Sequence, residues 1–294
     1  MTSALTTFAR TSAVIVIVLV LGAFTHLTLV ERDPSASRDP ASREASAAEV
    51  VPTPRGVAAG DWALKFRDEF TGNSLDLDKW RPNWLSDKDS GVTPPVNTAE
   101  RSCYDPQQVT VSGGSLNLTA ARRSCQLANG TTYDYASGLV QSRHDYEFTY
   151  GFAETRMYLP PNRDRAKGPL GSCGPNWAAF WVNGYGSTVS EIDVMECLEH
   201  NVQWTYHWDG YQKKAADVPA RWRKAMPSAS GGWHTFGVKW QPNLLEFYYD
   251  GVKVGTRKVS IPKDPHYLIA NLAVTGPQPT TPQTLKVDYI RVWQ

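Results

Sequence analysis

The sequence has no strong excess of charge of either sign and no long helical segment. Its 294 residues include 30 basic and 29 acidic side chains, for a formal net charge of +1. This balance creates no broad field for nucleic acid, and we find no basic patch with a matching motif. We therefore expect no nucleic-acid partner. We find no convincing long amphipathic helix, and residues 215–226 have room for one short helix at most.

Cysteine is also scarce. Cys103, Cys125, Cys173 and Cys197 are too few for a disulfide-framework protein and too scattered for a zinc site. In an exported domain they allow three pairings, and nearness in sequence favours Cys103–Cys125 and Cys173–Cys197. Four buried thiols are the alternative. Cys197 directly follows Glu196, so a bridge there would brace that part of the chain.

The first 58 residues lack the pattern of a folded domain. Arg10 precedes an apolar run from Ala13 to Phe24, which indicates that residues 1–30 are an export signal. A membrane span needs about 20 apolar residues, so a cleaved signal and a retained membrane anchor both remain open. Residues 31–58 repeat Arg-Asp-Pro among Ser and Ala, which predicts a disordered linker. We expect a secreted or extracytoplasmic protein.

From residue 59 onward, short alternating runs are separated by clusters of Gly, Asn, Asp and Pro. Residues 108–111 and 115–119 flank a Ser-Gly-Gly turn, and Asp250-Gly251 separates two later runs. Both are hairpin signals. Strands at this spacing predict a single all-β sandwich or barrel. The chain also has 11 Trp and 13 Tyr, whose ring faces suit sugar rings as well as a large core.

Three carboxylates lie within the hexapeptide Glu191-Ile192-Asp193-Val194-Met195-Glu196. In a regular strand, Glu191 and Asp193 share a face while Glu196 points away. One extra residue bulged out near Val194-Met195 would bring Glu196 back to the first face. Two carboxylates about 5–5.5 Å apart suit retaining glycoside hydrolysis, with the third holding the nucleophile in position. An exposed polar strand edge and a calcium site are the alternatives.

Several further motifs occur in order between Trp62 and Gln294. They are Phe66-Arg67-Asp68-Glu69-Phe70, Tyr150-Gly151-Phe152-Ala153-Glu154, Trp177-Ala178-Ala179-Phe180-Trp181, Trp233-His234-Thr235-Phe236, Asn271-Leu272-Ala273-Val274 and Val287-Asp288-Tyr289-Ile290-Arg291. With the acidic hexapeptide, they resemble glycoside hydrolase family 16, which includes laminarinases, lichenases, agarases and κ-carrageenases. The six-residue form of the acidic motif resembles the bulged-strand branch of laminarinases, agarases and carrageenases.

The resemblance implies that residues 59–294 are a catalytic domain. Its fold would be a concanavalin A-like β-jelly-roll sandwich of two antiparallel sheets with a concave substrate cleft. Glu191 would be the nucleophile, Asp193 its helper and Glu196 the acid/base, protonated near neutrality. We expect an exported, endo-acting retaining glycosidase on a β-1,3- or mixed-linkage glucan or a galactan. A transglycosylase that remodels a wall or capsule polysaccharide and a non-catalytic lectin-like module are the alternatives.

The resemblance also implies substrate contacts outside the acidic motif. The expected residues are Trp177, Trp181, His207, Trp208, Asn271 and Asn183, with Trp204 as a further stacking candidate. It implies a monomer without a required cofactor, and it suggests a structural calcium ion near Glu69 and Asp288. Residues 275–279 read Thr-Gly-Pro-Gln-Pro, where many β-1,3-glucanases have Gly-Gly-x-Trp-Pro. This departure leaves the substrate open.

Overall fold

The computed structural model describes residues 51–294 except 87, 160–172, 186–189, 199–200, 209–219, 226–231, 259, 262 and 277–278; the side chains of 201, 208 and 220–225 are also outside the description. The expected export signal and most of the expected linker therefore lie outside the described residues. Within the described ranges, no helix has the length and apolar character that a membrane crossing needs.

Two features differ from the sequence-based expectations. Residues 51–58, expected in the linker, belong to the same compact unit as the rest of the described chain. The indole N–H of Trp293 donates to the Pro52 carbonyl at 2.8 Å, and the Arg55 N–H donates to Glu154 at 3.2 Å, so the linker ends earlier than its composition indicates. Within residues 215–226, where the sequence has room for one short helix, residues 220–225 form a strand that pairs with residues 203–208.

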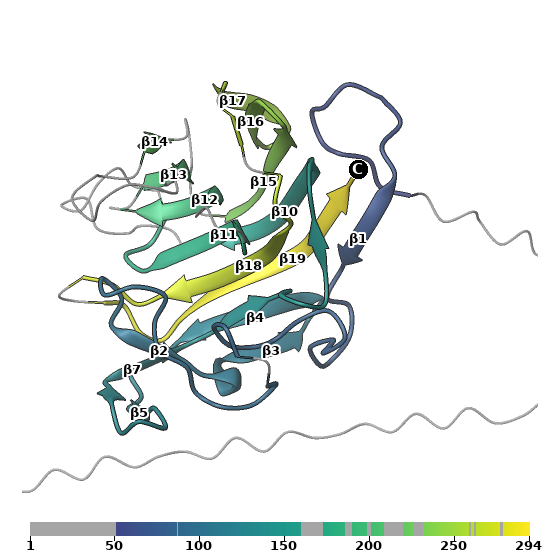
Figure 1. Cartoon of the computed structure of the whole chain (residues 1–294). Helices are drawn as coiled ribbons and strands as arrows, with labels where there is room; N and C mark the ends of the chain where they lie inside the picture. The colour runs from purple at the N-terminus through teal and green to yellow at the C-terminus, as the bar shows by residue number, and fades with distance from the viewer. Residues whose placement is uncertain are drawn as a thin grey trace, which may run out of the picture. The chain divides into compact units, whose positions relative to one another are not determined.

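Two antiparallel sheets contain about half of the described residues (Figure 1). Sheet A has, in spatial order, β17 (Val252–Arg257), β16 (Leu244–Tyr249), β15 (Gly232–Gln241), β10 (Gly151–Leu159), β19 (Gln283–Trp293), β4 (Ser115–Ala120) and β3 (Val109–Ser112), with β1 (Leu64–Asp68) also beside β19. Sheet B has β14 (Ala220–Ala225), β13 (Asn201–Trp208), β12 (Ser190–Leu198), β11 (Trp177–Gly184), β18 (His266–Ala273) and β8 (Leu139–Gln141), with β9 (Glu147–Phe148) also beside β18. The predicted all-β sandwich is confirmed.

Short elements complete the described part. Strands β2 (Ser102–Tyr104) and β7 (Tyr135–Ser137) pair in parallel, and β5 (Cys125–Gln126) pairs with β6 (Thr132–Tyr133). The 3₁₀ helix η1 (Pro106–Gln108) precedes β3, and the Asp105 side chain caps it by accepting from the Gln107 N–H. Both predicted disulfides are present, Cys103–Cys125 and Cys173–Cys197. The second ties β12 to the segment that leads into β11.

The core lies between the two sheets. Alternate residues of a strand point to opposite faces, so each sheet contributes one apolar face. Fully buried members from sheet B include Ile192, Phe180 and Leu268, and those from sheet A include Phe236 and Phe247, all in one contiguous cluster. This burial fixes which face of sheet B points outward, and the outward face carries the polar residues described below.

Gly255 on β17 has no room for a side chain. A Cβ there would lie 2.2 Å from Cζ2 of Trp204, whose buried ring stacks on Phe247 with centroids 4.2 Å apart. We expect Gly255→Ala to lower the free energy of unfolding by about 1–3 kcal/mol, because an overpacked core must shift. Urea denaturation measures this. Val252→Ala, at a residue 64% exposed on the same strand, is the control; equal stability of the two variants would contradict this packing.

Candidate active site

Strand β12 contains a one-residue bulge within the acidic hexapeptide. Against β13, Asp193 lies opposite Thr205 and Glu196 lies opposite Gln203. Two residues separate the acids on β12, whereas one residue separates their partners on β13. The pairing with β11 also skips Val194. The bulge lies where the sequence predicts it.

The bulge places all three acids on the face of sheet B that points away from the core. Ile192 and Val194-Met195 are fully buried in the core cluster. Because neighbouring side chains alternate and the bulge restores the phase, Glu191, Asp193 and Glu196 share the other face. Asp193 and Glu196 are 3% and 5% exposed, whereas the Glu191 side chain is 28% exposed. The hexapeptide is therefore not an exposed polar strand edge.

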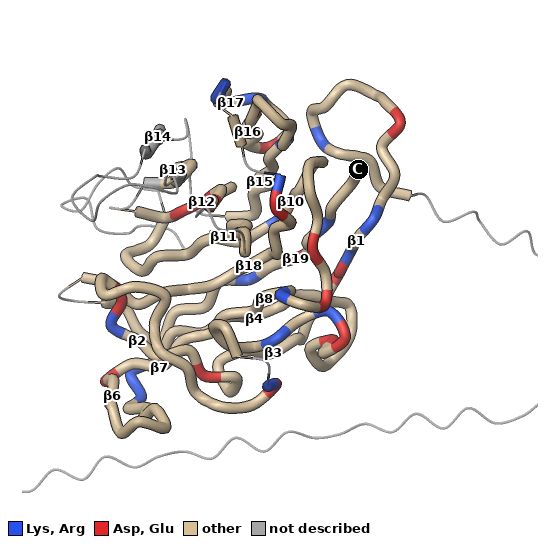
Figure 2. The backbone as a smooth tube through the Cα atoms, in the orientation of Figure 1, with Lys and Arg blue, Asp and Glu red and all other residues tan. Residues whose placement is uncertain are grey.

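Strand register identifies the neighbours of the acids on this outer surface, which we call the acid face. Figure 2 shows acidic positions on β12, with β13 and β11 on either side. The acid face comprises Glu191, Asp193 and Glu196 on β12, Gln203, Thr205 and His207 on β13, Trp177, Ala179, Trp181 and Asn183 on β11, and Tyr267, Ile269 and Asn271 on β18. Five of the nine predicted site residues lie beside the acids here: Trp177, Trp181, His207, Asn271 and Asn183.

Side chains of β13 contact the acids directly. His207 Nε2 lies 2.9 Å from Asp193 Oδ2 and 3.5 Å from Glu191 Oε1. The Thr205 hydroxyl donates to Glu196 Oε2 at 2.7 Å. A carboxylate held by a short hydrogen bond has a restricted orientation, which a positioned acid/base requires. Sequence reasoning missed Thr205, although alternation from His207 places it on the same face.

The acid face also contains the one described group that could hold a metal ion. Among the residues that the structure describes, only Glu191, Asp193 and His207 bring three such ligand atoms within 4.8 Å of one another. Calcium prefers six to eight oxygen ligands, and an imidazole nitrogen with two carboxylates does not meet that preference. The calcium alternative for the hexapeptide therefore lacks a suitable ligand set among these residues.

The second suggested calcium position is occupied by ion pairs. Glu69 accepts two hydrogen bonds from the Arg291 guanidinium, at 2.8 and 2.7 Å. Asp288 accepts one from Arg156 at 2.7 Å. Because each carboxylate is already paired with an arginine, the contacts at these two residues give no support to the suggested calcium site.

Trp177 and Trp181 lie on the same face because β11 pairs with β18 without a break. Trp181 is 5% exposed and packs against Trp84, with ring centroids 5.5 Å apart. Sequence reasoning missed Trp84, which lies in an irregular segment without periodicity. Asn183 donates to the Tyr267 hydroxyl at 3.3 Å. Direct stacking on sugar remains a prediction for both tryptophans of β11.

A chain of buried hydrogen bonds fixes the Trp181 indole. Its N–H donates to Asn271 Oδ1 at 2.8 Å, and the Asn271 amide donates to the Tyr104 hydroxyl at 3.0 Å. That hydroxyl donates to Glu100 Oε2 at 2.7 Å. The described contacts of Asn271 therefore support Trp181, and its expected contact with sugar remains a prediction.

The two tryptophans of β13 have different outcomes. Trp204 is fully buried in the core, stacked on Phe247 with Arg257 over its ring. Its suggested role in stacking on sugar is wrong, because it lies on the opposite face from Thr205. The backbone of Trp208 pairs with Ser190, but its side chain lies outside the description, so its substrate contact remains a prediction.

Glu100 makes the stability of this region pH-dependent. Burial raises its pKa from 4.5 to about 7, so between these values the folded state binds the proton that the unfolded state has released. The free energy of unfolding must fall as pH rises through this range. We expect Glu100→Gln to remove that fall, so that its stability relative to the parent rises by on the order of 1–3 kcal/mol between pH 4.5 and pH 8.

A buried histidine provides the control with opposite sign. Burial lowers the pKa of His266 from 6.5 to about 4, so its contribution to stability is lost as pH falls through this range. In urea denaturation at several pH values, His266→Gln should lose stability relative to the parent as pH rises. A Glu100→Gln difference that is constant with pH, or that slopes like that of His266→Gln, would contradict the assignment.

Comparison with known proteins identifies the family of this chain. The sequence model of Glycosyl hydrolases family 16 matches residues 97–291. Endo-1,3-1,4-beta-glycanase EglC from Rhizobium meliloti is 26% identical over 78% of this chain, and Glucan endo-1,3-beta-glucosidase A1 from Niallia circulans is 28% identical over 83%. The matches cover 51% and 39% of those relatives, so the chain spans about half of their length or less.

Solved structures show the same architecture. The laminarinase catalytic domain from Thermotoga maritima superimposes with a TM-score of 0.63 and 25% identity, over 80% of this chain and 99% of that one. The endo-beta-1,3-glucanase from Pyrococcus furiosus gives 0.63 at 22% identity, over 79% and 94%. The sandwich is therefore a jelly roll. Since the family match spans most of the chain and includes all three acids, the chain belongs to glycosyl hydrolase family 16.

Proposed function

We propose that this protein is an endo-acting hydrolase of β-1,3- or mixed-linkage glucan that retains anomeric configuration. The observation that carries the proposal is the β12 bulge, which brings Glu196 to the same face as Glu191 on a family 16 fold. The names of the relatives include 1,3- and 1,3-1,4-glucanases, which favours glucan over galactan as the substrate. The two steps of the mechanism follow from the known chemistry of a nucleophile and an acid/base carboxyl on one face.

In the first step, Glu191 attacks the anomeric carbon while Glu196 gives its proton to the departing glycosidic oxygen. The C–O bond to the leaving sugar breaks, and a glycosyl ester of Glu191 forms. In the second step, Glu196 takes a proton from water, and the water oxygen attacks the same carbon and releases Glu191. Protons and bonds balance over the two steps, and the mechanism uses no cofactor.

The remaining acid-face residues serve this pair. Asp193 and His207, 2.9 Å apart, lie beside Glu191 and hold the nucleophile in position. Thr205 fixes the orientation of the Glu196 carboxyl. Trp177 offers a ring to the substrate on the same face, and Trp181 packs against Trp84. The glucan chain would thus run across β13, β12, β11 and β18.

We propose export of this domain. The two disulfides support it, because they persist in oxidising compartments. The N-terminal segment would act as the signal or as a retained anchor, and the domain would act as a monomer. Fractionation of the producing cells, followed by sequencing of the mature N-terminus, would separate a cleaved signal from an anchor. Recovery of the intact chain in the cytosol would contradict export.

A panel of polymers tests the activity. The full chain would be incubated with laminarin, mixed-linkage β-glucan, agarose and κ-carrageenan, and reducing ends and product lengths followed with time. The proposal predicts reducing ends from the glucans, with intermediate-length products before small sugars accumulate. Turnover of the galactans alone would overturn the substrate. Redistribution of chain lengths without new reducing ends would indicate a transglycosylase, and binding without products a lectin-like module.

A further inference from the structure

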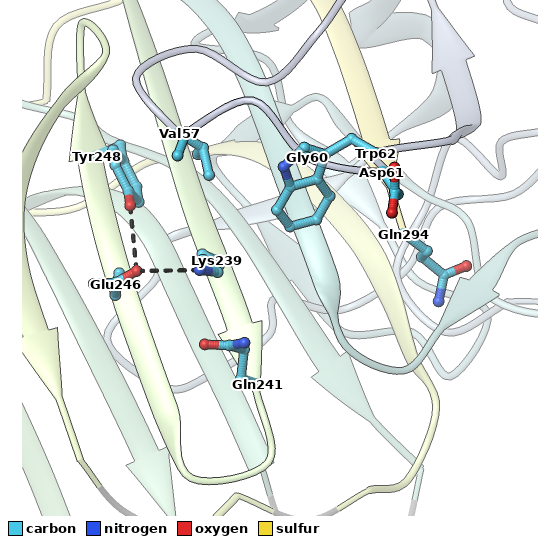
Figure 3. A pocket seen from close by; sticks show the side chains of 10 residues that line it. Val57, Gly60, Asp61, Trp62, Lys239, Gln241, Glu246, Tyr248 and Gln294 are labelled. Carbon is cyan, nitrogen blue, oxygen red and sulfur yellow. Dashed lines mark hydrogen bonds and ion pairs between the residues drawn. The ribbon is translucent and has the colours of Figure 1, made fainter.

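A pocket of about 500 Å³ lies on sheet A, away from the acid face (Figure 3). Strands β15 and β16 form its base, and residues 57–62 form one wall. Val238 and Trp240 on β15 are buried in the core. Their neighbours Lys239 and Gln241 therefore point outward, into the pocket side of the sheet. The acids are on the outer face of sheet B, so the core separates the two sites.

Several polar groups around this pocket have no partner within the described protein. Three of the lining side chains, the indole N–H of Trp62, the carboxylate of Asp61 and the amide of Gln241, make no hydrogen bond to any residue that the structure describes. Gln294 is anchored, since its amide nitrogen donates to the Thr149 and Tyr150 carbonyls at 3.0 and 3.2 Å. That anchoring fixes the Gln294 side chain beside the pocket and leaves its Oε1 as a hydrogen-bond acceptor.

The charges in the pocket disfavour an anionic ligand. Glu246 accepts from Lys253 at 2.8 Å and lies 3.7 Å from Lys239, and the Tyr248 hydroxyl donates to it at 3.3 Å. These contacts offset the one lysine that lines the pocket. Asp61 then adds an exposed negative charge. A phosphate, sulfate or uronate would therefore meet net repulsion rather than a cationic site.

An apolar ligand also fits this pocket poorly. It would cover the indole N–H and the amide groups without replacing their hydrogen bonds to water, which is unfavourable. A neutral ligand with many hydroxyls and an apolar ring face meets both requirements. Its hydroxyls would pair with the amides and the carboxylate, and its ring face would pack against Trp62. Sugar rings have this combination, and the pocket volume lies within the roughly 300–1,000 Å³ of ligand sites.

We propose that this pocket is a second, non-catalytic carbohydrate-binding site for a neutral stretch of the glucan substrate. The identity of the sugar rests on the proposed function, whereas the existence of the site does not. A polymer held here keeps other stretches of the same polymer near the acid face. Such tethering raises the effective concentration of substrate without any change at the catalytic residues.

The test uses the full chain carrying Glu191→Gln, titrated with laminaritetraose by calorimetry. We expect about two binding events per chain in this parent and about one after Trp62→Ala or Gln241→Ala is added. Asn243→Ala, at an exposed residue of the same hairpin outside the pocket lining, should retain both events. Gln241 is exposed, so its substitution distinguishes loss of binding from loss of folding. A single binding event in the parent that all three variants retain would overturn the proposal.

Activity on substrates of different size gives an independent readout. With Glu191 intact, Gln241→Ala should hydrolyse laminaritetraose at the parental rate and insoluble glucan at least about 3-fold more slowly, because only the polymer can reach both sites. Equal losses on both substrates would overturn the tethering role. If the parent hydrolyses no glucan, the proposed function fails, and the same calorimetry with galactan and other neutral oligosaccharides still tests the site.

Discussion

Glu191→Gln is expected to slow hydrolysis of β-glucan by about 10⁴-fold or more, because an amide cannot form the glycosyl ester. The amide has nearly the shape of the carboxylate, so the fold and glucan binding should be retained. The measurement is the rate of reducing-end release together with the affinity for laminarin. Asp288→Asn is the control, since that acid pairs with Arg156 on sheet A and should leave the rate unchanged.

Azide as an added nucleophile can show whether Glu191 is the catalytic nucleophile. In Glu191→Ala, azide has room to attack the anomeric carbon of an activated aryl β-glycoside directly, while Glu196 remains available. The expected product is the α-glycosyl azide, because a single displacement inverts configuration. Recovery of the β-azide from this variant would show that a nucleophile other than Glu191 acts first. Activity near that of the parent in Glu191→Gln would contradict the assignment outright.

Glu196→Ala should slow hydrolysis of β-glucan by about 10²–10⁴-fold, because the sugar leaving group then departs without a proton. The first step with an activated aryl glycoside should be affected far less, since its leaving group needs no proton. The measurement is the ratio of parent to variant rates for the two substrates. Equal losses on both substrates would contradict a role in protonation.

Azide also distinguishes Glu196→Ala from Glu191→Ala. In Glu196→Ala the glycosyl ester on Glu191 still forms. Water then has no general base to activate it, so azide, which needs none, attacks the ester instead. Two displacements give the β-glycosyl azide. The two variants should thus yield azides of opposite configuration from one substrate, and an α-azide from both would show that their roles are wrongly assigned.

Thr205→Val should show a milder form of the Glu196 effect, because it removes the 2.7 Å hydrogen bond to that carboxyl.

The all-β class and the common face of the three acids could be predicted because they depend on local rules. Turn signals and alternating runs indicate a sandwich or barrel, and the odd spacing of Glu196 requires a bulge if all three acids serve one face. The jelly roll was implied by the resemblance to family 16. The face of Trp204 was misjudged because the same alternation was not applied to β13. Trp204 lies three residues before His207, so the two side chains point to opposite faces of the sheet.

Contacts between distant segments could not be predicted. The Tyr104–Asn271 hydrogen bond joins residues 167 positions apart, and neither residue type indicates the other. Trp84 reaches Trp181 from an irregular segment, where no periodicity assigns a direction. The start of the folded unit was missed because a backbone carbonyl, that of Pro52, makes the contact with Trp293. Composition carries no signal for contacts made by the main chain.

The anomeric configuration of the first-formed product tests the central claim most directly. Proton NMR of the wild-type reaction, recorded before mutarotation, distinguishes the α and β reducing ends. Glu191 and Glu196 on one face, acting as nucleophile and acid/base, predict the β anomer first, with the α anomer appearing later by mutarotation. An α anomer at the earliest times would contradict double displacement, and with it the functional meaning of the bulge in β12.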